Sequence, residues 1–327
     1  MTSPLTIWCN AKFSEAATRL LVEGLRPHKV VFSAHASVSV LTPGTADPGL
    51  AKADIAFGQP PVEQGIECER LRWIEVTSAG FTRYDREDFR EAMSRRGAAF
   101  TNSSSVFADP CAQHALAMML GLDRQLLPSH RDQLTDRSWH YAERRADSRL
   151  LNGQTVLLLG YGAIGRRLAE LLMPFRMKLY AVRRKTYSEP GTHIISEERL
   201  SSVIAEADHV VNVLPDNPTT LNYVNARRLS WCKRGARFYN VGRGTTVDQN
   251  ALIKALESGQ LGGAYLDVME PEPLPPSHPL WSAPNCFITP HTAGGRHDQD
   301  EALVRHFIAN FTAFMRGEDA VWLDRVF

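Results

Sequence analysis

The sequence predicts an α/β protein of two lobes, each built around a mostly parallel sheet. Two observations carry this prediction. The chain has 327 residues, about twice the usual length of one domain. Along it, short apolar runs alternate with helix-like segments, which is the pattern of βα units. Hydrophobic residues make up 43% of the chain and charged residues 22%, values typical of globular proteins.

The N-terminal part of the chain contains the first series of βα units. Apolar residues at helical spacing predict a helix from Ser14 to Leu25, with Ser14 as its N-cap. Short apolar runs before and after this helix predict strands, at residues 5–9, 29–32, 54–57, 73–76 and 98–101.

A helix that is apolar on nearly every side follows this first series. Asp109 and Pro110 predict its start, as an N-cap and a proline in the first turn. A helix without a polar face is expected to be buried, which suits an element between two lobes. The charge-dense stretch 129–149 after it predicts a surface arm and not a separate domain.

A second α/β series begins at Gln154. Apolar runs predict strands at residues 155–159, 179–182, 209–213, 237–240, 264–267 and 286–289. Helices are expected at 163–173, 249–258 and 300–315, ended by Pro174, Gly259 and Gly317 respectively. The proline-rich run 271–284 predicts an irregular loop, because proline has no amide hydrogen for a strand ladder or a helix interior.

Charge and cysteine content exclude several classes of protein. Lys and Arg number 37 against 36 Asp and Glu, a net charge of +1, whereas nucleic-acid-binding proteins usually carry a basic excess. The five scattered cysteines contain no CxxC pair, so we expect reduced thiols in a cytoplasmic protein without a metal site. The first residues do not resemble a secretion signal, and no apolar run reaches the ~18 residues that span a membrane.

A glycine-rich turn joins the strand at 155–159 to the helix after it. Its sequence, Gly160-Tyr161-Gly162-Ala163-Ile164-Gly165, fits the pattern GxGxxG. The glycines permit a tight turn and a close approach of the backbone, and the helix N-terminus offers free amides to a pyrophosphate. The alternative is a turn that binds nothing. Because strand, turn and helix occur together, we predict dinucleotide binding.

The end of the next strand predicts which dinucleotide binds. NAD-binding proteins usually carry a carboxylate about 20 residues after the glycines, where it holds the ribose hydroxyls. Here the strand ends at Arg183, Arg184 and Lys185, and the first carboxylate comes only at Glu189. Cations at this place would attract the 2′-phosphate of NADP. The alternative is a solvated basic loop, and we expect NADP(H) to be favoured over NAD(H).

Three further segments each place a functional side chain just after a predicted strand. They are Asn240-Val241-Gly242-Arg243-Gly244, the segment from Leu266 to Leu274 that holds Asp267 and Glu272, and the segment from Asn285 to Gly294 that holds His291. In open α/β sheets, ligands bind at the carboxyl ends of strands. Each of these residues alone could be an ordinary surface residue, but their order and spacing are distinctive.

In this order and spacing the chain resembles the D-isomer-specific 2-hydroxyacid dehydrogenases, which include glyoxylate and hydroxypyruvate reductases. The resemblance implies that Arg243 binds the carboxylate of a 2-keto acid and polarises its carbonyl. It implies that His291 is the proton donor and acceptor, and that Glu272 pairs with its ring and keeps the imidazolium available near neutral pH. Backbone amides of Ala79 and Gly80 would bind the substrate carboxylate.

The same resemblance implies the cofactor contacts and the lobes. Beside the glycine turn and the arginines, the cofactor site would include Leu214, Pro215, Val241, Gly242, Asp267 and His291. The expected fold has Rossmann-like or flavodoxin-like lobes, with a cofactor lobe at 103–295 inserted into a discontinuous substrate lobe at 1–102 and 296–327. A homodimer through the cofactor lobes is implied, embraced by the 129–149 arm. Trp139 of this arm either reaches the partner's substrate pocket or packs locally.

Two rival functions are open at this stage. One is a nucleotide-sensing binding protein, like the transcriptional corepressors that share this fold; the intact Arg243, Glu272 and His291 set favours an enzyme. The other is a formate or phosphite dehydrogenase. Formate dehydrogenases of this fold have an extended N-terminus and a glutamine before the histidine segment, and we find neither here. The sequence does not name the keto acid.

Overall fold

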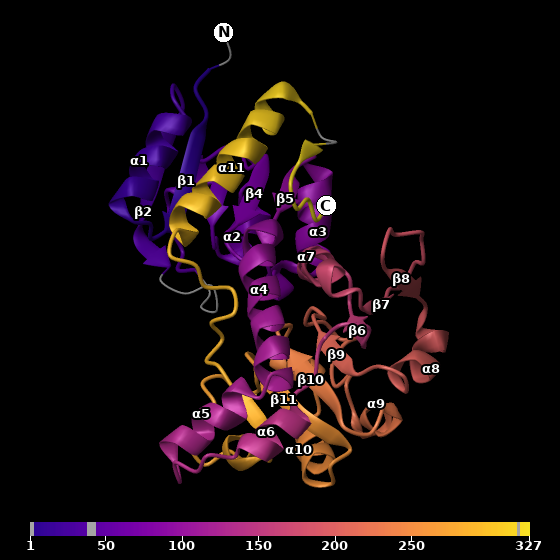
Figure 1. Ribbon diagram of the computed structural model, residues 1–327. Helices are drawn as coiled ribbons and strands as arrows, with labels where there is room; N and C mark the ends of the chain where they lie inside the picture. The colour runs from indigo at the N-terminus through magenta and orange to yellow at the C-terminus, as the bar shows by residue number, and fades with distance from the viewer. Residues whose placement is uncertain (1–2, 38–43, 319–320) are drawn as a thin grey trace. The chain divides into compact units, whose positions relative to one another are not determined.

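A computed structural model describes residues 3–37, 44–318 and 321–327 (Figure 1). Residues 1–2, 38–43 and 319–320, which belong to the predicted substrate lobe, lie outside the described residues. The chain divides into two compact units, unit 1 with residues 1–107 and 296–327, and unit 2 with residues 108–295. Among the described residues, no helix is long and apolar enough to cross a membrane.

Unit 1 is built on a parallel sheet in the order β2-β1-β3-β4-β5, the flavodoxin-like order. The strands are β1 (Thr6–Ala11), β2 (Lys29–Ser37), β3 (Ile55–Gly58), β4 (Trp73–Val76) and β5 (Ala99–Thr101). The helices are α1 (Glu15–Gly24), α2 (Val62–Glu67), α3 (Glu87–Arg95) and α11 (Gln299–Arg316). The predicted strands and both predicted helices of this unit are therefore present.

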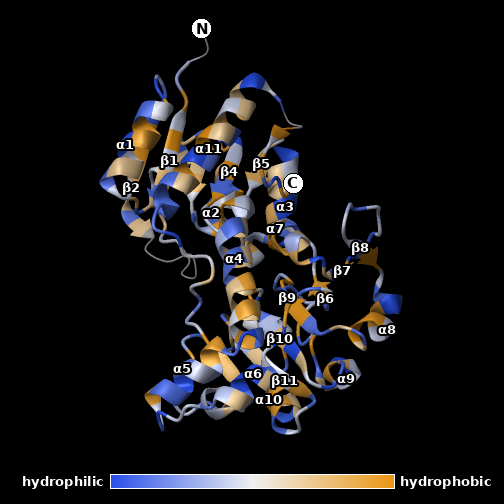
Figure 2. Cartoon of the chain, in the orientation of Figure 1, coloured by the Kyte–Doolittle hydropathy of each residue, from blue (hydrophilic) through white to orange (hydrophobic). Residues whose placement is uncertain are grey.

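Both faces of the unit 1 sheet are covered, because its strands send alternate side chains to two separate cores. Ile7 and Phe57 join the core beneath α1 and α11, whereas Trp8 and Ala56 join the core on the side of α2 and α3. The ring of Phe307 on α11 stacks on Trp73 at 4.8 Å and on Phe57 at 4.1 Å. Hydrophilic and hydrophobic residues alternate around α11 (Figure 2), as expected of a helix with one buried face.

Local end signals explain the bounds of these helices. The Ser14 hydroxyl accepts a hydrogen bond from the N–H of Ala17 at 3.2 Å, which makes Ser14 the N-cap of α1. At the other end of the chain, Gly317 ends α11 in the left-handed conformation, with φ of 67°.

The predicted start of the apolar helix is wrong. Helix α4 spans Ser104–Asp123 and contains Pro110 in its interior. The reason is tertiary: the N–H of Ser104 is bound by the side chain of Asn102, and that of Ser105 by the carboxylate of Asp324 at 2.7 Å. These two caps start the helix before Asp109, whose carboxylate instead forms an ion pair with Arg167 at 2.5 Å.

Unit 2 is built on a larger parallel sheet in the order β12-β11-β10-β9-β6-β7-β8. The strands are β6 (Thr155–Leu159), β7 (Lys178–Val182), β8 (His193–Ile195), β9 (His209–Asn212), β10 (Ala236–Asn240), β11 (Leu261–Leu266) and β12 (Cys286–Ile288). The helices are α7 (Ala163–Leu172), α8 (Leu200–Ile204), α9 (Ala226–Trp231) and α10 (Gln249–Glu257). Only β8 among these strands was not predicted. The α/β fold with two Rossmann-like sheets is confirmed.

Two further features of unit 2 match the expected outline. The arm contains two helices, α5 (Leu126–Leu134) and α6 (Tyr141–Asp147). The proline-rich run 271–284 is irregular apart from one short 3₁₀ turn, Pro279–Ser282. Chain order in the sheet reverses between β6 and β9, because the chain first proceeds from β6 to β7 and β8 and then continues at β9. Ligands bind at such a switch point, outside the carboxyl ends of the strands.

Candidate active site

The glycine turn lies at the switch point, directly after β6. Gly160 has φ of 97°, a conformation that other residues rarely adopt. A Cβ on Gly165 would lie 2.9 Å from the Gly160 carbonyl oxygen, so this glycine permits the close packing of α7 on the turn. A Cβ on Gly162 would meet nothing within 4 Å, and Gly162 caps α7 without a side chain. The turn therefore leaves open space beside Gly162, the residue before the first N–H groups of α7, where a pyrophosphate would bind.

The loops after β9 and β10 border the same edge of the sheet. Leu214 and Pro215 follow β9, and Val241 and Gly242 follow β10. A Cβ on Gly242 would lie 2.8 Å from the Leu214 carbonyl oxygen, so the two loops touch through their backbones. The N–H of Gly242 binds the side chain of Asn240 at 3.1 Å. All four residues predicted here thus stand at the carboxyl ends of neighbouring strands.

The end of β7 is basic, as the sequence indicates. Arg183 donates to the Tyr187 hydroxyl at 3.0 Å, and Arg184 donates to the Thr219 hydroxyl at 3.2 Å. Neither arginine forms an ion pair with any carboxylate among the described residues. Glu189, the first carboxylate after the strand, pairs instead with Arg166 at 3.1 Å.

Glu272 and His291 form a direct pair. The distance between Nδ1 of His291 and Oε2 of Glu272 is 2.7 Å, and the other Glu272 oxygen accepts the N–H of Met269 at 3.0 Å. Burial would raise the pKa of Glu272, but the hydrogen bonds from His291 and Met269 and the charge of Arg243 lower it below its usual value. Glu272 is then an anion that can only accept hydrogen bonds. Nδ1 of His291 therefore carries the hydrogen of the 2.7 Å contact, and Nε2 does not contact the carboxylate.

Asp267 holds the backbone segment that presents His291. Its side chain is 2% exposed. The carboxylate accepts hydrogen bonds from the Thr289 hydroxyl at 2.6 Å and from the N–H groups of Thr292 and Ala293 at 2.8 and 2.9 Å. The N–H of His291 binds the Asp267 carbonyl oxygen at 2.8 Å. These contacts hold the His291 backbone in the left-handed conformation, with φ of 53°. A residue other than glycine keeps this conformation only when its surroundings impose it. The predicted contact of Asp267 with the cofactor stays a prediction.

Arg243 lies on the loop that packs against the same region. Its carbonyl oxygen accepts hydrogen bonds from Asn240 at 3.1 Å and from Thr246 at 2.6 Å. The next residue, Gly244, packs so closely on the Met269 backbone that no Cβ would fit. Because Met269 also binds Glu272, backbone contacts link the Arg243 loop to the Glu272–His291 pair.

Three polar residues behind Asp267 were not recognised from the sequence as part of this arrangement. Nε2 of His114 lies 2.9 Å from the Tyr265 hydroxyl, which donates at 2.5 Å to the Thr289 hydroxyl, which in turn donates to Asp267. Because each hydroxyl gives its hydrogen toward the carboxylate, Nε2 of His114 is the donor to Tyr265. No sequence pattern indicated this series of hydrogen bonds, because its members come from α4, β11 and the end of β12, which meet only in the folded protein.

Ala79 and Gly80 belong to unit 1, in the turn after β4. Asn102 donates to the Ala79 carbonyl oxygen at 2.9 Å, and the Ser78 hydroxyl donates to that of Gly80 at 2.6 Å. Both contacts use the carbonyl groups of the turn and not its backbone amides. Their predicted role toward the substrate stays a prediction.

A doubly wound sheet with this glycine turn, and with a histidine–carboxylate pair at its strand ends, is the arrangement of a dinucleotide-binding oxidoreductase. The family model described as "D-isomer specific 2-hydroxyacid dehydrogenase, NAD binding domain" matches residues 116–293. The chain belongs to this family, as its sequence resemblance predicted.

Individual relatives agree with this assignment. A glyoxylate reductase from Pyrococcus furiosus is 32% identical over 256 residues, which are 76% of this chain and 74% of the relative. A D-isomer-specific 2-hydroxyacid dehydrogenase from Xanthobacter autotrophicus Py2, solved with NADPH and MES, superposes with a TM-score of 0.82 at 26% identity, covering 100% of this chain and 98% of the other. An NADPH-dependent glyoxylate/hydroxypyruvate reductase from Sinorhizobium meliloti, solved with NADP and malonate, has a TM-score of 0.72 at 25% identity, covering 99% and 97%.

Proposed function

We propose that this protein is an NADP(H)-dependent reductase of a small 2-keto acid such as glyoxylate or hydroxypyruvate. The observation that carries the proposal is the 2.7 Å contact between His291 and Glu272 at the carboxyl ends of the unit 2 strands, with the charge of Arg243 acting on the same carboxylate. Relatives named as glyoxylate reductases support the class of substrate.

The residues divide the reaction between them. Arg243 binds the carboxylate of the keto acid through its planar guanidinium and polarises the neighbouring carbonyl. A bound reduced nicotinamide supplies a hydride to the carbonyl carbon. Nε2 of the His291 imidazolium gives its proton to the carbonyl oxygen, and a 2-hydroxy acid results. Glu272 accepts from Nδ1 throughout, so it orients the ring and stabilises its charged form. Ala79 and Gly80 are proposed as further ligands of the substrate carboxylate.

The proposed preference for NADP(H) rests on Arg183 and Arg184. They stand where NAD-dependent proteins carry a carboxylate, and a guanidinium suits a phosphate better than a ribose hydroxyl. Two structural relatives were solved with NADPH or NADP, which agrees with this choice. The expected result is a higher kcat/KM with NADPH than with NADH, measured with glyoxylate, hydroxypyruvate, pyruvate and bulkier keto acids. A higher value with NADH would refute the preference.

Substitution of Arg183 tests the same point directly. Arg183→Asp should weaken NADPH binding more than NADH binding, because the new carboxylate repels the 2′-phosphate and can accept ribose hydroxyls. Dissociation constants for the two cofactors, measured by fluorescence titration, check this. Equal losses for both cofactors would contradict phosphate recognition at the end of β7.

We also propose a cytoplasmic homodimer through unit 2. Large apolar side chains on the arm are strongly exposed, with Leu134 71%, Trp139 91% and Tyr141 62% exposed, and such a group is typical of a contact surface. The five cysteines are free thiols, which suits a reducing compartment. Sedimentation should give twice the mass of the chain, and Trp139→Ala should weaken the dimer; a monomer at micromolar concentration would refute this part.

A further inference from the structure

Two arginines from different elements converge on one tyrosine at the end of β7. Arg166 lies in the first turns of α7, and Arg183 follows β7. Their guanidinium groups donate to the same Tyr187 hydroxyl oxygen, at 2.8 Å from Arg166 and 3.0 Å from Arg183. Both guanidinium carbons also lie close to the Tyr187 ring, at 5.6 and 5.4 Å from its centroid.

Arg166 is held in this position by two further groups. Its guanidinium lies 5.2 Å from the centroid of the Tyr161 ring, and the Tyr161 hydroxyl is anchored on Thr192 at 3.2 Å. On its other side, Arg166 pairs with Glu189 at 3.1 Å. A pocket of about 120 Å³ borders the pair and is lined by Arg166 and Glu189 together with Glu170, which itself pairs with Arg167 at 2.7 Å.

The cluster of Arg166, Arg183, Tyr187 and Glu189 carries an excess of positive charge. Arg166, Arg183, Arg184 and Lys185 contribute four cations within or beside it, and Glu189 is the carboxylate that pairs with one of them. Two guanidinium groups that share one neutral oxygen repel each other, and this repulsion is reduced when a dianion binds between or beside them. The excess positive charge of the cluster therefore favours a doubly charged anion.

We propose that Arg166 and Tyr187 are specificity residues for the cofactor, an inference that rests on the proposed use of NADP(H). Arg166 is the second guanidinium that holds the ribose 2′-phosphate, beside Arg183. Tyr187 is a positioning residue that keeps both guanidinium groups in place through its hydroxyl. Glu189 holds Arg166 in the absence of the phosphate and opposes the phosphate charge, so it limits the preference for NADP(H).

Three single variants and one control variant test this assignment by calorimetric titration with NADPH, NADH, 2′,5′-ADP and 5′-ADP. Arg166→Gln should weaken binding of NADPH and 2′,5′-ADP about tenfold, the effect expected for one lost charge-assisted hydrogen bond. Tyr187→Phe should weaken it about threefold, and Glu189→Gln should strengthen it about threefold. Binding of NADH and 5′-ADP should change less than about twofold.

Arg234→Gln is the matched control. Arg234 is exposed and precedes β10, so it lies at the amino ends of the parallel strands, whereas the arginine cluster lies at the carboxyl end of β7. This variant removes the same charge and should leave all four affinities unchanged. Thermal unfolding checks that each variant is folded. The opposite signs expected for Glu189→Gln and Arg166→Gln separate phosphate recognition from a general loss of structure.

The outcomes distinguish this inference from the proposed function. If the unaltered protein binds NADH more tightly than NADPH, the proposed cofactor preference is wrong. If it prefers NADPH but Arg166→Gln and Tyr187→Phe match the Arg234→Gln control, the inference alone is overturned. Weaker NADPH binding by Glu189→Gln would also overturn it, because Glu189 would then assist the phosphate site.

Discussion

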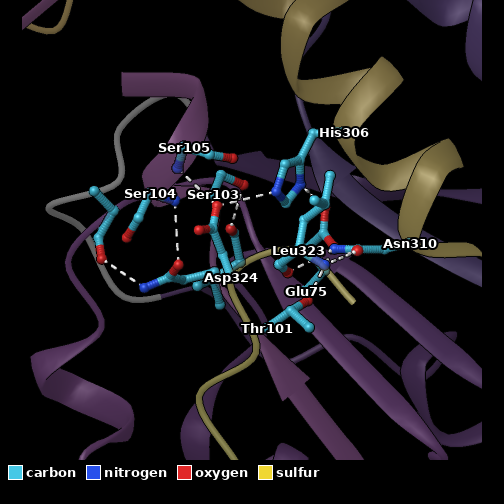
Figure 3. A network of polar contacts seen from close by, with 12 residues as sticks. Glu75, Thr101, Ser103, Ser104, Ser105, His306, Asn310, Leu323 and Asp324 are labelled. Atoms are coloured by element: carbon cyan, nitrogen blue, oxygen red, sulfur yellow. Dashed lines mark hydrogen bonds and ion pairs between the residues drawn. The ribbon is translucent and has the colours of Figure 1, made fainter. Parts of the chain in front are cut away.

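Each unit of the molecule contains a histidine bound to carboxylate, and the surroundings of the two histidines differ. In unit 2, His291 contacts one carboxylate through Nδ1, and its side chain is 37% exposed. In unit 1, His306 contacts two carboxylates, Glu75 through Nδ1 at 3.0 Å and Asp324 through Nε2 at 3.1 Å, and its side chain is 4% exposed (Figure 3). Within the described part of the chain, only Nδ1 of His291 contacts a carboxylate, whereas both ring nitrogens of His306 do.

The surroundings of His306 fix its charge. Burial alone would lower the pKa of His306, but the hydrogen bonds with Asp324 and Glu75 and their negative charges outweigh it and raise the pKa to about 9. Glu75 also accepts from Asn310 at 2.7 Å and from Thr101 at 2.9 Å. The cluster joins β4, β5, α11 and the C-terminal segment, and Asp324 caps the start of α4.

The comparison indicates which surroundings would allow a histidine–carboxylate pair to transfer a proton. A buried imidazolium between two anions has a structural role, because both of its N–H groups already bind carboxylates and no other acceptor is within reach. A half-exposed ring with one anion on one side can give its second proton to a ligand. Substitution of His291 should therefore lower activity and affect stability little, whereas substitution of His306 should lower stability and affect activity little.

The largest expected effect is on catalysis by unit 2. His291→Ala should lower kcat by about 10² to 10⁴, the usual contribution of a positioned acid, while the dissociation constant of NADPH stays within about twofold. Steady-state kinetics with glyoxylate and a binding titration measure the two quantities. His297→Ala, which alters an exposed histidine, is the control and should keep full activity. An unchanged kcat in His291→Ala would remove His291 from the acid–base role.

The next effect is on the stability of unit 1. His306→Ala should lower the free energy of unfolding by about 3–5 kcal/mol, because it leaves the buried Glu75 carboxylate without its cationic partner. Urea unfolding measures the loss, and kcat at low temperature should be nearly unchanged. A loss below about 1 kcal/mol, the range of an exposed pair, would show that the cluster is not a structural tie.

The smallest effect is a dependence of stability on pH. The pKa of His306 is raised in the folded protein, so its contribution is complete below the unfolded value near 6.5 and is lost as pH rises through about 9. The difference in unfolding free energy between the unaltered protein and His306→Gln should shrink across that window. A difference that stays constant from about pH 6 to about pH 10 would contradict the charged state assigned to His306.

Local sequence signals predicted most of the fold. The strands Trp73–Val76 and Thr155–Leu159 have the predicted bounds, because both are short apolar runs with clear ends. Ser14 and Gly317 mark helix ends through contacts within a few residues of themselves. The predicted start of α4 was wrong because the N–H of Ser105 in its first turn is capped by Asp324, which lies far away in the sequence. Strand β8 was missed because three residues carry too little periodicity.

The sequence indicated candidate residues for the site but not their contacts. Spacing and family resemblance indicated Arg243, Glu272 and His291, whose roles stay predictions, and in the structure Glu272 and His291 lie 2.7 Å apart. The cluster of Arg166 and Tyr187 was missed, since no pattern indicates that a helix residue and a loop residue meet beside Arg183. His306 was missed for the same reason, because Glu75 and Asp324 lie in distant parts of the sequence.

The kcat for glyoxylate reduction at neutral pH, compared between the unaltered protein and Glu272→Gln, tests the central claim most directly. Glutamine keeps the shape of the side chain but removes the charge that stabilises the imidazolium of His291. We expect kcat of Glu272→Gln to fall about tenfold or more at neutral pH, because the ring of His291 loses the carboxylate that orients it. An unchanged kcat in Glu272→Gln would contradict the claim that Glu272 positions His291 for proton transfer.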